Sequence, residues 1–205
     1  LAREHSIYLV AGSMPEADGS RTYNTAYVFA PDGSCIAKHR KMHLFDIDIT
    51  GGQRFMESET LTAGNTVTVF DTPWGKMGLC ICYDIRFPEL ARLMALAGAK
   101  VICIPAAFNM TTGPVHWELS FRARALDNQV YLLGCAPARD LTASYHSWGH
   151  SIVTDPWGTV TAQLAEAEGI LFAELDLEKV ETIRKELPLL RHRRTDVYEL
   201  REVRK

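Results

Sequence analysis

Residues 76–107 contain the pattern that most constrains the fold of this chain. They begin with an apolar run, KMGLCIC, and end with another, VICIPAA, and each run is typical of a buried strand. Between the two, apolar residues recur with a helical period, Pro88 suits a first helical turn and Gly98 suits a C-terminal stop. The order strand, helix, strand predicts a βαβ unit with parallel strands and a right-handed crossover.

Strands, hairpins and helices alternate along the rest of the chain. The segment at 42–65 has no sustained period and predicts a long loop, a feature that is usually functional or disordered. The other patterns predict strands, hairpins or helices at residues 7–13, 25–41, 66–84, 115–129, 130–138, 150–164 and 170–187. Because 205 residues are enough for one sizeable core and too few for two ordinary domains, the sequence predicts a single α/β sandwich domain over residues 1–205.

Charge and hydropathy exclude several classes of partner. A formal net charge of −3 gives no electrostatic reason to expect nucleic acid or an anionic membrane as a partner. No apolar run reaches the length needed to span a bilayer, and no secretory signal is visible. The first residue is Leu1 rather than Met, so we expect the sequence to be part of a longer one, and a leader outside it stays open.

The cysteines favour a reducing compartment. Their number is odd and their spacing irregular, which is unlike a disulfide framework, at Cys35, Cys80, Cys82, Cys103 and Cys135. We therefore expect a cytoplasmic protein, with mitochondria as the alternative. Since two of the cysteines form C-x-C with no second Cys or His pair nearby, a zinc site is not expected.

Cys82 is the candidate nucleophile. It is the last apolar residue of its predicted strand and comes just before a helix, which is where open α/β sheets expose their sites. Backbone N–H groups at such a turn can form an oxyanion hole. Cys80 lies one pleat deeper, where apolar surroundings keep a thiol inert. Position alone leaves a second interpretation open, because most buried cysteines are small packing residues.

A thiol needs a base or a nearby cation to become a thiolate. His43 and His116 are available as bases, and Lys41 lies at a predicted strand end, where its charge would lower the pKa of the thiol and hold an anionic intermediate. The alternative for Lys41 is a solvated charge in the basic run KHRK. The residues alone do not choose between these.

The segments together, in this order, resemble the nitrilase, or carbon–nitrogen hydrolase, superfamily. The resemblance rests on RKMHLFD, FMESE and GLCICYDIRFPEL, and it continues through PAAFNMTTGPVHWELSFRARALDNQVY, WGHSIVTDPWGTV and LPLLRHRRTDVY. It covers nearly the whole chain. Three segments are most similar to the ω-amidase branch of the superfamily: HLFDIDI, FNMTTGPVHWEL and PARDLTASYHSWGHS. Enzymes of that branch hydrolyse the terminal amide of 2-oxoglutaramate and 2-oxosuccinamate.

The resemblance implies a fold and a set of roles. The fold would be a four-layer α-β-β-α sandwich, often dimerised, and the protein would act as a homodimer on a small-molecule amide without metal or cofactor. Cys82 would attack the amide carbon and form a thioester. Lys41 would stabilise the tetrahedral intermediate together with the backbone N–H after Cys82, and Glu57, in FMESE, would orient the lysine and the substrate.

One expected group has no counterpart. The general base of the family is a glutamate on an early strand, upstream of everything in this chain. Glu16, in SMPE, matches a later hairpin of the family, and a turn carboxylate is the favoured interpretation for it. We therefore expect the domain to lack its first strands, its first helix and the catalytic glutamate. A protein that keeps the fold as a catalytically silent scaffold is the alternative of a different class.

The pocket walls are assigned from position. Phe45, in the long loop, is expected to line the pocket beside Tyr83, and residues following a strand end are expected to line it too, at Phe108, Asn109 and Thr111.

Asp84, Arg86 and Glu89 are expected to form structural ion pairs that brace the turn. A dicarboxylate-like substrate needs a cationic contact, for which Arg122, Arg124 and Arg139 are candidates. Within the superfamily, the alternative is an amidase of deaminated glutathione.

Overall fold

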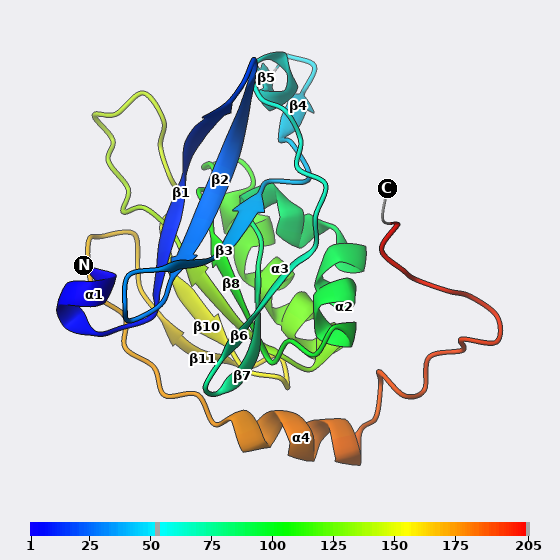
Figure 1. The fold of residues 1–205 in the computed structure, drawn as a ribbon. Helices are drawn as coiled ribbons and strands as arrows, with labels where there is room; N and C mark the ends of the chain where they lie inside the picture. Colours follow the sequence, from blue (N-terminus) through cyan, green and yellow to red (C-terminus); the bar gives the residue numbers. More distant parts are fainter. Residues whose placement is uncertain (52–53, 204–205) are drawn as a thin grey trace.

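The computed structural model describes residues 1–51 and 54–203 and contains two main β-sheets (Figure 1). The larger sheet has six strands in the order β11-β10-β9-β8-β7-β6. Its strands are β6 (Thr68–Thr72), β7 (Gly75–Leu79), β8 (Val101–Pro105), β9 (Tyr131–Cys135), β10 (Ile152–Thr154) and β11 (Val160–Gln163). Strands β7, β8 and β9 are parallel, and the other neighbouring pairs are antiparallel.

The βαβ prediction is confirmed. Helix α2 (Pro88–Leu96) connects β7 to β8, and the two strands pair in parallel with Met77 opposite Val101. Pro88 starts the helix, where its missing N–H costs no hydrogen bond, and Gly98 follows the helix with φ +101°, a conformation that side chains disfavour. The crossover places Cys82 at the carboxyl end of β7.

The smaller sheet consists of three antiparallel strands in the order β1-β2-β3. They are β1 (Leu9–Asp18), β2 (Arg21–Phe29) and β3 (Cys35–Arg40), so the predicted hairpin at 25–41 is confirmed. The strand predicted as buried at 7–13 is found as β1, but it is mostly half-buried or exposed. Its side chains are exposed because β1 is an edge strand and no helical layer covers the outer face of this sheet in the described residues (Figure 1).

The two sheets pack face to face, and helices cover the outer face of the larger one (Figure 1). Alternation along β8 divides its side chains between the two interfaces. Ile102 and Ile104 pack with Met94 of α2 and with Phe121 of α3 (Gly113–Asn128). Val101 and Cys103 face the other way and form a second core with residues of β2. The described layers are thus helix, sheet and sheet.

The α/β sandwich architecture expected from the sequence is therefore present. The outer helical layer over β1–β3, which a four-layer sandwich requires, is not among residues 1–51 and 54–203. Helix α4 (Leu177–Glu186) buries Val180 and Ile183 at one end of the sandwich, and Asp176 caps it by accepting hydrogen bonds from two backbone N–H groups. A short helix, α1 (Ala2–His5), starts the chain.

Two sequence predictions differ from the structure. The strand predicted at the start of 170–187 is absent, because residues 170–175 lie against β-strand side chains without pairing to a strand. The predicted loop at 42–65 contains the hairpin β4 (Asp46–Asp48) and β5 (Arg54–Met56) and a 3₁₀ turn, η1 (Glu57–Glu59). Gly52 and Gln53 of that loop lie outside the described residues. This hairpin determines where Glu57 lies.

Candidate active site

Cys82 occupies the turn that follows the central strand β7. After β7 ends at Leu79, the chain runs on beside β8, with the N–H of Cys80 bonded to the carbonyl of Cys103, and then turns into the 3₁₀ helix η2 (Cys82–Arg86). Cys82 has φ 48°, in the left-handed region that a residue with a Cβ rarely adopts. Such a conformation costs on the order of 1–3 kcal/mol and is found most often at functional sites.

The thiol of Cys82 is largely enclosed. Its Sγ lies 3.8 Å from the carbonyl oxygen of Ala107. Burial raises the pKa of the Cys82 thiol, while the positive charge of Lys41 acts in the opposite direction. A nearby cation that is correctly placed therefore controls how much thiolate is present.

Lys41 supplies that cation from the end of β3. Its backbone is fixed on both sides, since its N–H donates to Asn24 and its carbonyl accepts from Gly64. The side chain is only 2% exposed, and its Nζ lies 2.6 Å from Oε2 of Glu57. The alternative of a solvated charge for Lys41 is therefore wrong. A buried ammonium requires a paired charge, and Glu57 provides it.

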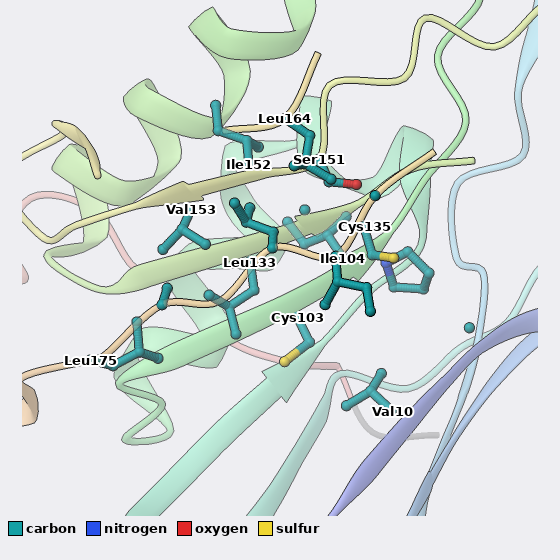
Figure 2. A pocket seen from close by; sticks show the side chains of 17 residues that line it. Val10, Cys103, Ile104, Leu133, Cys135, Ser151, Ile152, Val153, Leu164 and Leu175 are labelled. Carbon is teal, nitrogen blue, oxygen red and sulfur yellow. The ribbon is translucent and has the colours of Figure 1, made fainter. Parts of the chain in front are cut away.

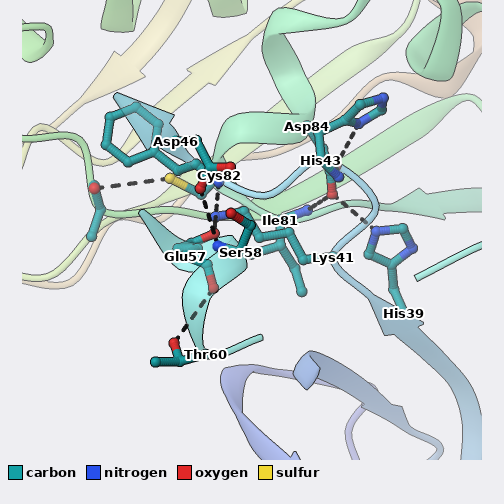
Figure 3. A network of polar contacts seen from close by, with 12 residues as sticks. His39, Lys41, His43, Asp46, Glu57, Ser58, Thr60, Ile81, Cys82 and Asp84 are labelled. Carbon is teal, nitrogen blue, oxygen red and sulfur yellow. Dashed lines mark hydrogen bonds and ion pairs between the residues drawn. The ribbon is translucent and has the colours of Figure 1, made fainter. Parts of the chain in front are cut away.

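The β4–β5 hairpin brings Glu57 to this position. Oε2 of Glu57 also accepts a hydrogen bond of 2.8 Å from the backbone N–H of Phe45, and the N–H of Glu57 donates to the carbonyl of Phe45. Figure 3 shows Glu57 and Lys41 beside Cys82, from three separate segments of the chain. The three residues named from the sequence are thus brought together.

These side chains line a cavity of about 560 Å³. Its wall is formed by residues including Asn24, Lys41, Phe45, Phe55, Glu57, Cys82, Ala107, Pro137 and Tyr145. A side pocket of about 20 Å³ adjoins it, since the two share Phe45, Cys82, Ala107 and Tyr145. By volume the main cavity suits a small molecule and the side pocket a single small group.

Four of the five wall residues expected from the sequence line these cavities. Phe45 lines both, and its ring lies edge-on to the ring of Tyr83 at a centroid distance of 5.0 Å. Tyr83, Phe108 and Asn109 line the side pocket. Phe108 is also buried against Trp117, at a centroid distance of 5.1 Å, so it serves the core as well.

Thr111 is not brought into the site. It is exposed and lines neither cavity, whereas its neighbour Thr112 lines the side pocket. The local reason is a turn in which the N–H and the hydroxyl of Thr112 both donate to Oδ1 of Asn109, at 2.9 Å each. This turn draws Thr112 inward and leaves Thr111 at the surface.

Asp84 has different partners from those expected. The sequence suggested that Asp84 belongs to a cluster of structural ion pairs with Arg86, but the buried carboxylate of Asp84 contacts His39 and His43 instead (Figure 3). Burial raises the pKa of Asp84, but the hydrogen bonds from the two histidines outweigh it, and the pKa falls to about 2. Asp84 is therefore a carboxylate at neutral pH.

Two other cysteines are inert, as the sequence predicted for Cys80. Cys80 and Cys103 are both buried, and burial raises the pKa of Cys80 well above its ordinary value and that of Cys103 to about 12.

Glu16 is not a turn carboxylate: it lies in β1, where Arg40, Lys38 and Thr25 bond to its side chain. Arg40 is the largest cause of the lowered pKa of Glu16.

Sequence reasoning missed Tyr145. Its hydroxyl donates a 2.6 Å hydrogen bond to the carbonyl of Ala107, the same oxygen that Cys82 Sγ contacts, and its ring lines both cavities. Burial is the main cause that raises the pKa of Tyr145, to about 12, so its hydroxyl stays protonated. It lies in a polar loop far along the chain from Cys82, so no local pattern indicates its role.

Arg86 is the cation that lines the side pocket. Its guanidinium lies over the ring of Phe108, at 4.6 Å from the centroid, and its Nη1 is 3.0 Å from Nδ1 of His116. No carboxylate forms an ion pair with Arg86 in the described part of the chain. Burial lowers the pKa of Arg86, and the nearby Cys82 raises it.

The three arginines named from the sequence are engaged elsewhere. The Nε of Arg122 donates to the carbonyl of Gly158, and the guanidinium of Arg139 donates to two backbone carbonyls at residues 147 and 148. Arg124 donates to a backbone carbonyl and pairs with Asp127. None of the three lines the cavity or its side pocket.

A further cavity, of about 520 Å³, lies on the face of β8, β9 and β10 (Figure 2). Its wall is apolar and includes Val10, Leu133, Val153 and Leu175, with Ser151 and the thiols of Cys103 and Cys135 as its more polar groups. It contains no charged side chain among the residues that line it. The chemistry of the site is therefore concentrated around Cys82.

Residues 1–51 and 54–203 contain neither a metal-binding cluster of side chains nor a helix suited to cross a membrane. No three or more His, Cys, Asp or Glu side chains there are grouped so that they could hold a metal ion. No helix of this part of the chain has the length and apolar character that crossing a membrane requires.

Two β-sheets with covering helices, and a cysteine, a lysine and a glutamate around one cavity, are features that the resemblance to a known class of hydrolases implies. The family model for carbon–nitrogen hydrolase matches residues 1–185. The omega-amidase NIT2-A of Xenopus laevis is 54% identical over 204 residues, which are 100% of this chain and 74% of that protein. The omega-amidase NIT2 of Homo sapiens is 52% identical over 198 residues, 97% of this chain and 72% of that protein. The chain belongs to the carbon–nitrogen hydrolase family.

Solved structures agree on the fold. Nit3 of Saccharomyces cerevisiae, a member of branch 10 of the nitrilase superfamily, superposes with a TM-score of 0.86 at 50% identity, covering 94% of this chain and 68% of that one. The C. elegans NitFhit protein gives a TM-score of 0.90 at 43% identity, covering 97% of this chain and 49% of that one. The resemblance inferred from the sequence motifs is confirmed.

Proposed function

We propose that this chain hydrolyses a linear amide through a thioester on Cys82. The observation that carries the proposal is the grouping of Cys82, Lys41 and Glu57 around one cavity. Relatives that are 52% and 54% identical over nearly the whole chain are named as amidases, which supports the same class of reaction. No metal or cofactor enters the proposed chemistry.

The proposed reaction has two steps. The sulfur of Cys82 bonds to the amide carbon, and negative charge develops on the amide oxygen, where the ammonium of Lys41 and the backbone N–H of Tyr83 stabilise it. The C–N bond then breaks, and ammonia leaves with the proton of the thiol. Water adds to the thioester, the C–S bond breaks, and a carboxylic acid and the free thiol result. Glu57 holds the Lys41 ammonium in place throughout.

The proposed substrates are 2-oxoglutaramate and 2-oxosuccinamate, which carry a carboxylate at the end remote from the amide. The relatives' names support this choice, because they denote ω-amidases. Arg86 supports it independently, because a partly buried guanidinium beside Cys82 gives an anionic group a charged partner. We assign the carboxylate contact to Arg86 rather than to Arg122, Arg124 or Arg139.

The proton acceptor is a separate part of the proposal. Both steps need a general base, and Glu57 is the one carboxylate among the described residues that line the cavity. Glu57 is already bonded to Lys41 and to the N–H of Phe45. We propose that a carboxylate other than Glu57 acts as this base.

Ammonia release tests the proposal. The natural protein, with its intact mass measured, is incubated with 2-oxoglutaramate, and we expect ammonia that is abolished in Cys82→Ala and retained in Cys80→Ala. A mass increase equal to the acyl group, found on the peptide that contains Cys82, would identify the thioester. Ammonia release that survives Cys82→Ala contradicts the proposed nucleophile.

Two alternatives are outcomes of the same assay. Turnover of deaminated glutathione in preference to 2-oxoglutaramate would place the chain in that branch of the superfamily. Absence of ammonia from any amide would favour the scaffold interpretation, which gains support from the single carboxylate at the cavity among the described residues.

Assembly and location complete the proposal. A row of exposed apolar side chains runs along α3, at Val115, Leu119 and Leu126, and supports self-association as a homodimer through this helix. A monomeric mass in solution would contradict the proposed homodimer.

All five cysteines are free thiols, which supports the cytoplasm as the compartment, with mitochondria as the alternative. Cell fractionation tests the proposed compartment.

A further inference from the structure

Asp84 connects the segments that carry the two central groups of the site. It follows Cys82 by two residues, and His43 follows Lys41 by two. Oδ1 of Asp84 accepts hydrogen bonds from the backbone N–H and from Nδ1 of His43, at 2.9 and 2.8 Å. Oδ2 accepts from the backbone N–H of Ile81 and from Nε2 of His39, at 2.9 and 3.0 Å. One buried carboxylate thus joins the end of β3, the segment after Lys41 and the turn before Cys82 (Figure 3).

The turn around Cys82 is closed from both directions. The side chain of Asp84 accepts from the N–H of Ile81, and the N–H of Asp84 donates to the carbonyl of Ile81 at 3.0 Å. Cys82 lies inside this closed turn with its left-handed φ of 48°. A strained conformation of this kind persists only where its surroundings fix it, and Asp84 supplies two of the fixing bonds.

Only a carboxylate fits between these donors. Each oxygen of Asp84 faces a backbone N–H, from His43 on one side and Ile81 on the other, and neither N–H can become an acceptor. An asparagine has one oxygen and one NH₂ group, so in either orientation its NH₂ meets a backbone N–H. The shape of the side chain could be kept by asparagine, but the bonding could not.

We infer that Asp84 is a positioning residue for the reaction, holding the turn of Cys82 and the segment of Lys41 at a fixed separation. The inference rests on the proposed role of Cys82 as the nucleophile and goes beyond it, because Asp84 lines neither the cavity nor the side pocket. Asp84 acts on the thiol through the position of the Lys41 ammonium. The thiolate fraction of Cys82 depends on that position, since Lys41 opposes the effect of burial.

The test follows the alkylation of Cys82 by iodoacetamide against pH, without substrate, with peptide mass spectrometry to separate Cys82 from the other thiols. In Asp84→Asn the apparent pKa of Cys82 rises by about one unit, and the alkylation rate near pH 7 falls about tenfold. The matched control is Asp155→Asn. Asp155 is also buried and accepts from two backbone N–H groups, but it lies in the β10–β11 turn, where its ion pair is with Lys179. We expect Asp155→Asn to lower stability and leave the Cys82 profile unchanged.

A second variant keeps the inference testable if Asp84→Asn does not fold. His43→Ala removes one side-chain bond to Oδ1 but keeps the carboxylate and the backbone N–H, so we expect a smaller rise in the same direction. A Cys82 profile that matches the wild type in Asp84→Asn, or in His43→Ala where Asp84→Asn does not fold, overturns the inference, and so does an equal change in Asp155→Asn. The readout needs no amide turnover, so a failure of the proposed amidase activity is detected separately by the ammonia assay.

Discussion

The ammonium of Lys41 and the carboxylate of Glu57 form an ion pair of 2.6 Å in which the lysine is almost completely buried. Lys41 lies at the end of β3 and Glu57 at the start of η1, so the pair joins the small sheet to the β4–β5 hairpin. Because a buried cation without a partner is costly, the hairpin and the site depend on each other.

Replacement of Glu57 tests this dependence. In Glu57→Gln the Lys41 ammonium loses its counter-charge, so we expect the free energy of unfolding to fall by roughly 3 kcal/mol. We also expect kcat/KM to fall by about 10²-fold, because a displaced cation stabilises the developing charge less well. Urea unfolding and steady-state kinetics measure the two effects. The control is Glu59→Gln, whose exposed carboxylate pairs with Arg54 at the surface and for which neither change is expected.

Acid stability tests the state of Asp84. Its pKa is about 2 in the folded protein and 3.8 ordinarily, so the unfolded chain binds a proton first as the pH falls. The stabilisation is fully present above about pH 4 and is lost as the pH falls toward 2, and it amounts to about 2 kcal/mol. We expect the wild type to lose this advantage over Asp84→Asn between pH 5 and pH 2 in urea unfolding.

The exposed Asp71 provides the control for that experiment. Its carboxylate is 82% exposed, with Lys76 as its partner. The stability difference between wild type and Asp71→Asn is expected to stay nearly constant over the same pH range. A difference between wild type and Asp84→Asn that does not change with pH would mean that Asp84 is not ionised in the fold.

Packing of α3 on the large sheet depends on Gly134 of β9. A Cβ on this residue would lie 2.4 Å from Cζ of Phe121, so the ring or the helix must move. We expect Gly134→Ala to lower the free energy of unfolding by about 1–3 kcal/mol. Gly169→Ala is the matched control, since a Cβ there meets only ordinary contacts with Leu164, at 3.5 Å and beyond. Equal thermal melting temperatures for the two variants would refute this account of the packing.

The sequence predicted the elements whose partners are close along the chain. The βαβ unit of residues 75–105 and the β2–β3 hairpin follow from apolar period and turn residues alone. The strand predicted near residue 170 is not found, because an apolar run becomes a strand only where a neighbouring strand offers free backbone groups. No such pairing is present there in the described residues.

In the candidate site, too, only the features that depend on neighbouring residues could be predicted from local patterns in the sequence. Cys82 was identified because its place between strand and helix is local, but no sequence rule shows that Asp84 would face His39 and His43 rather than Arg86. Tyr145 was missed because it reaches the cavity from a polar loop. The placement of Lys41 and Glu57 was predicted from a resemblance, and its physical basis, the fold of the β4–β5 hairpin, is visible only in three dimensions.

Arg86 provides a test of substrate choice. If its guanidinium binds the remote carboxylate of the substrate, Arg86→Gln removes a charge-assisted hydrogen bond worth roughly 1.5–3 kcal/mol, so kcat/KM for 2-oxoglutaramate falls by about 10- to 100-fold. A neutral amide of similar length, such as butyramide, lacks that carboxylate and is expected to change little. The ratio of the two kcat/KM values is therefore the quantity to measure. Arg122→Gln, which alters an arginine outside both cavities, should leave the ratio unchanged. Equal losses on both amides in Arg86→Gln would mean that Arg86 supports the turn at Cys82 rather than recognising the substrate's charge.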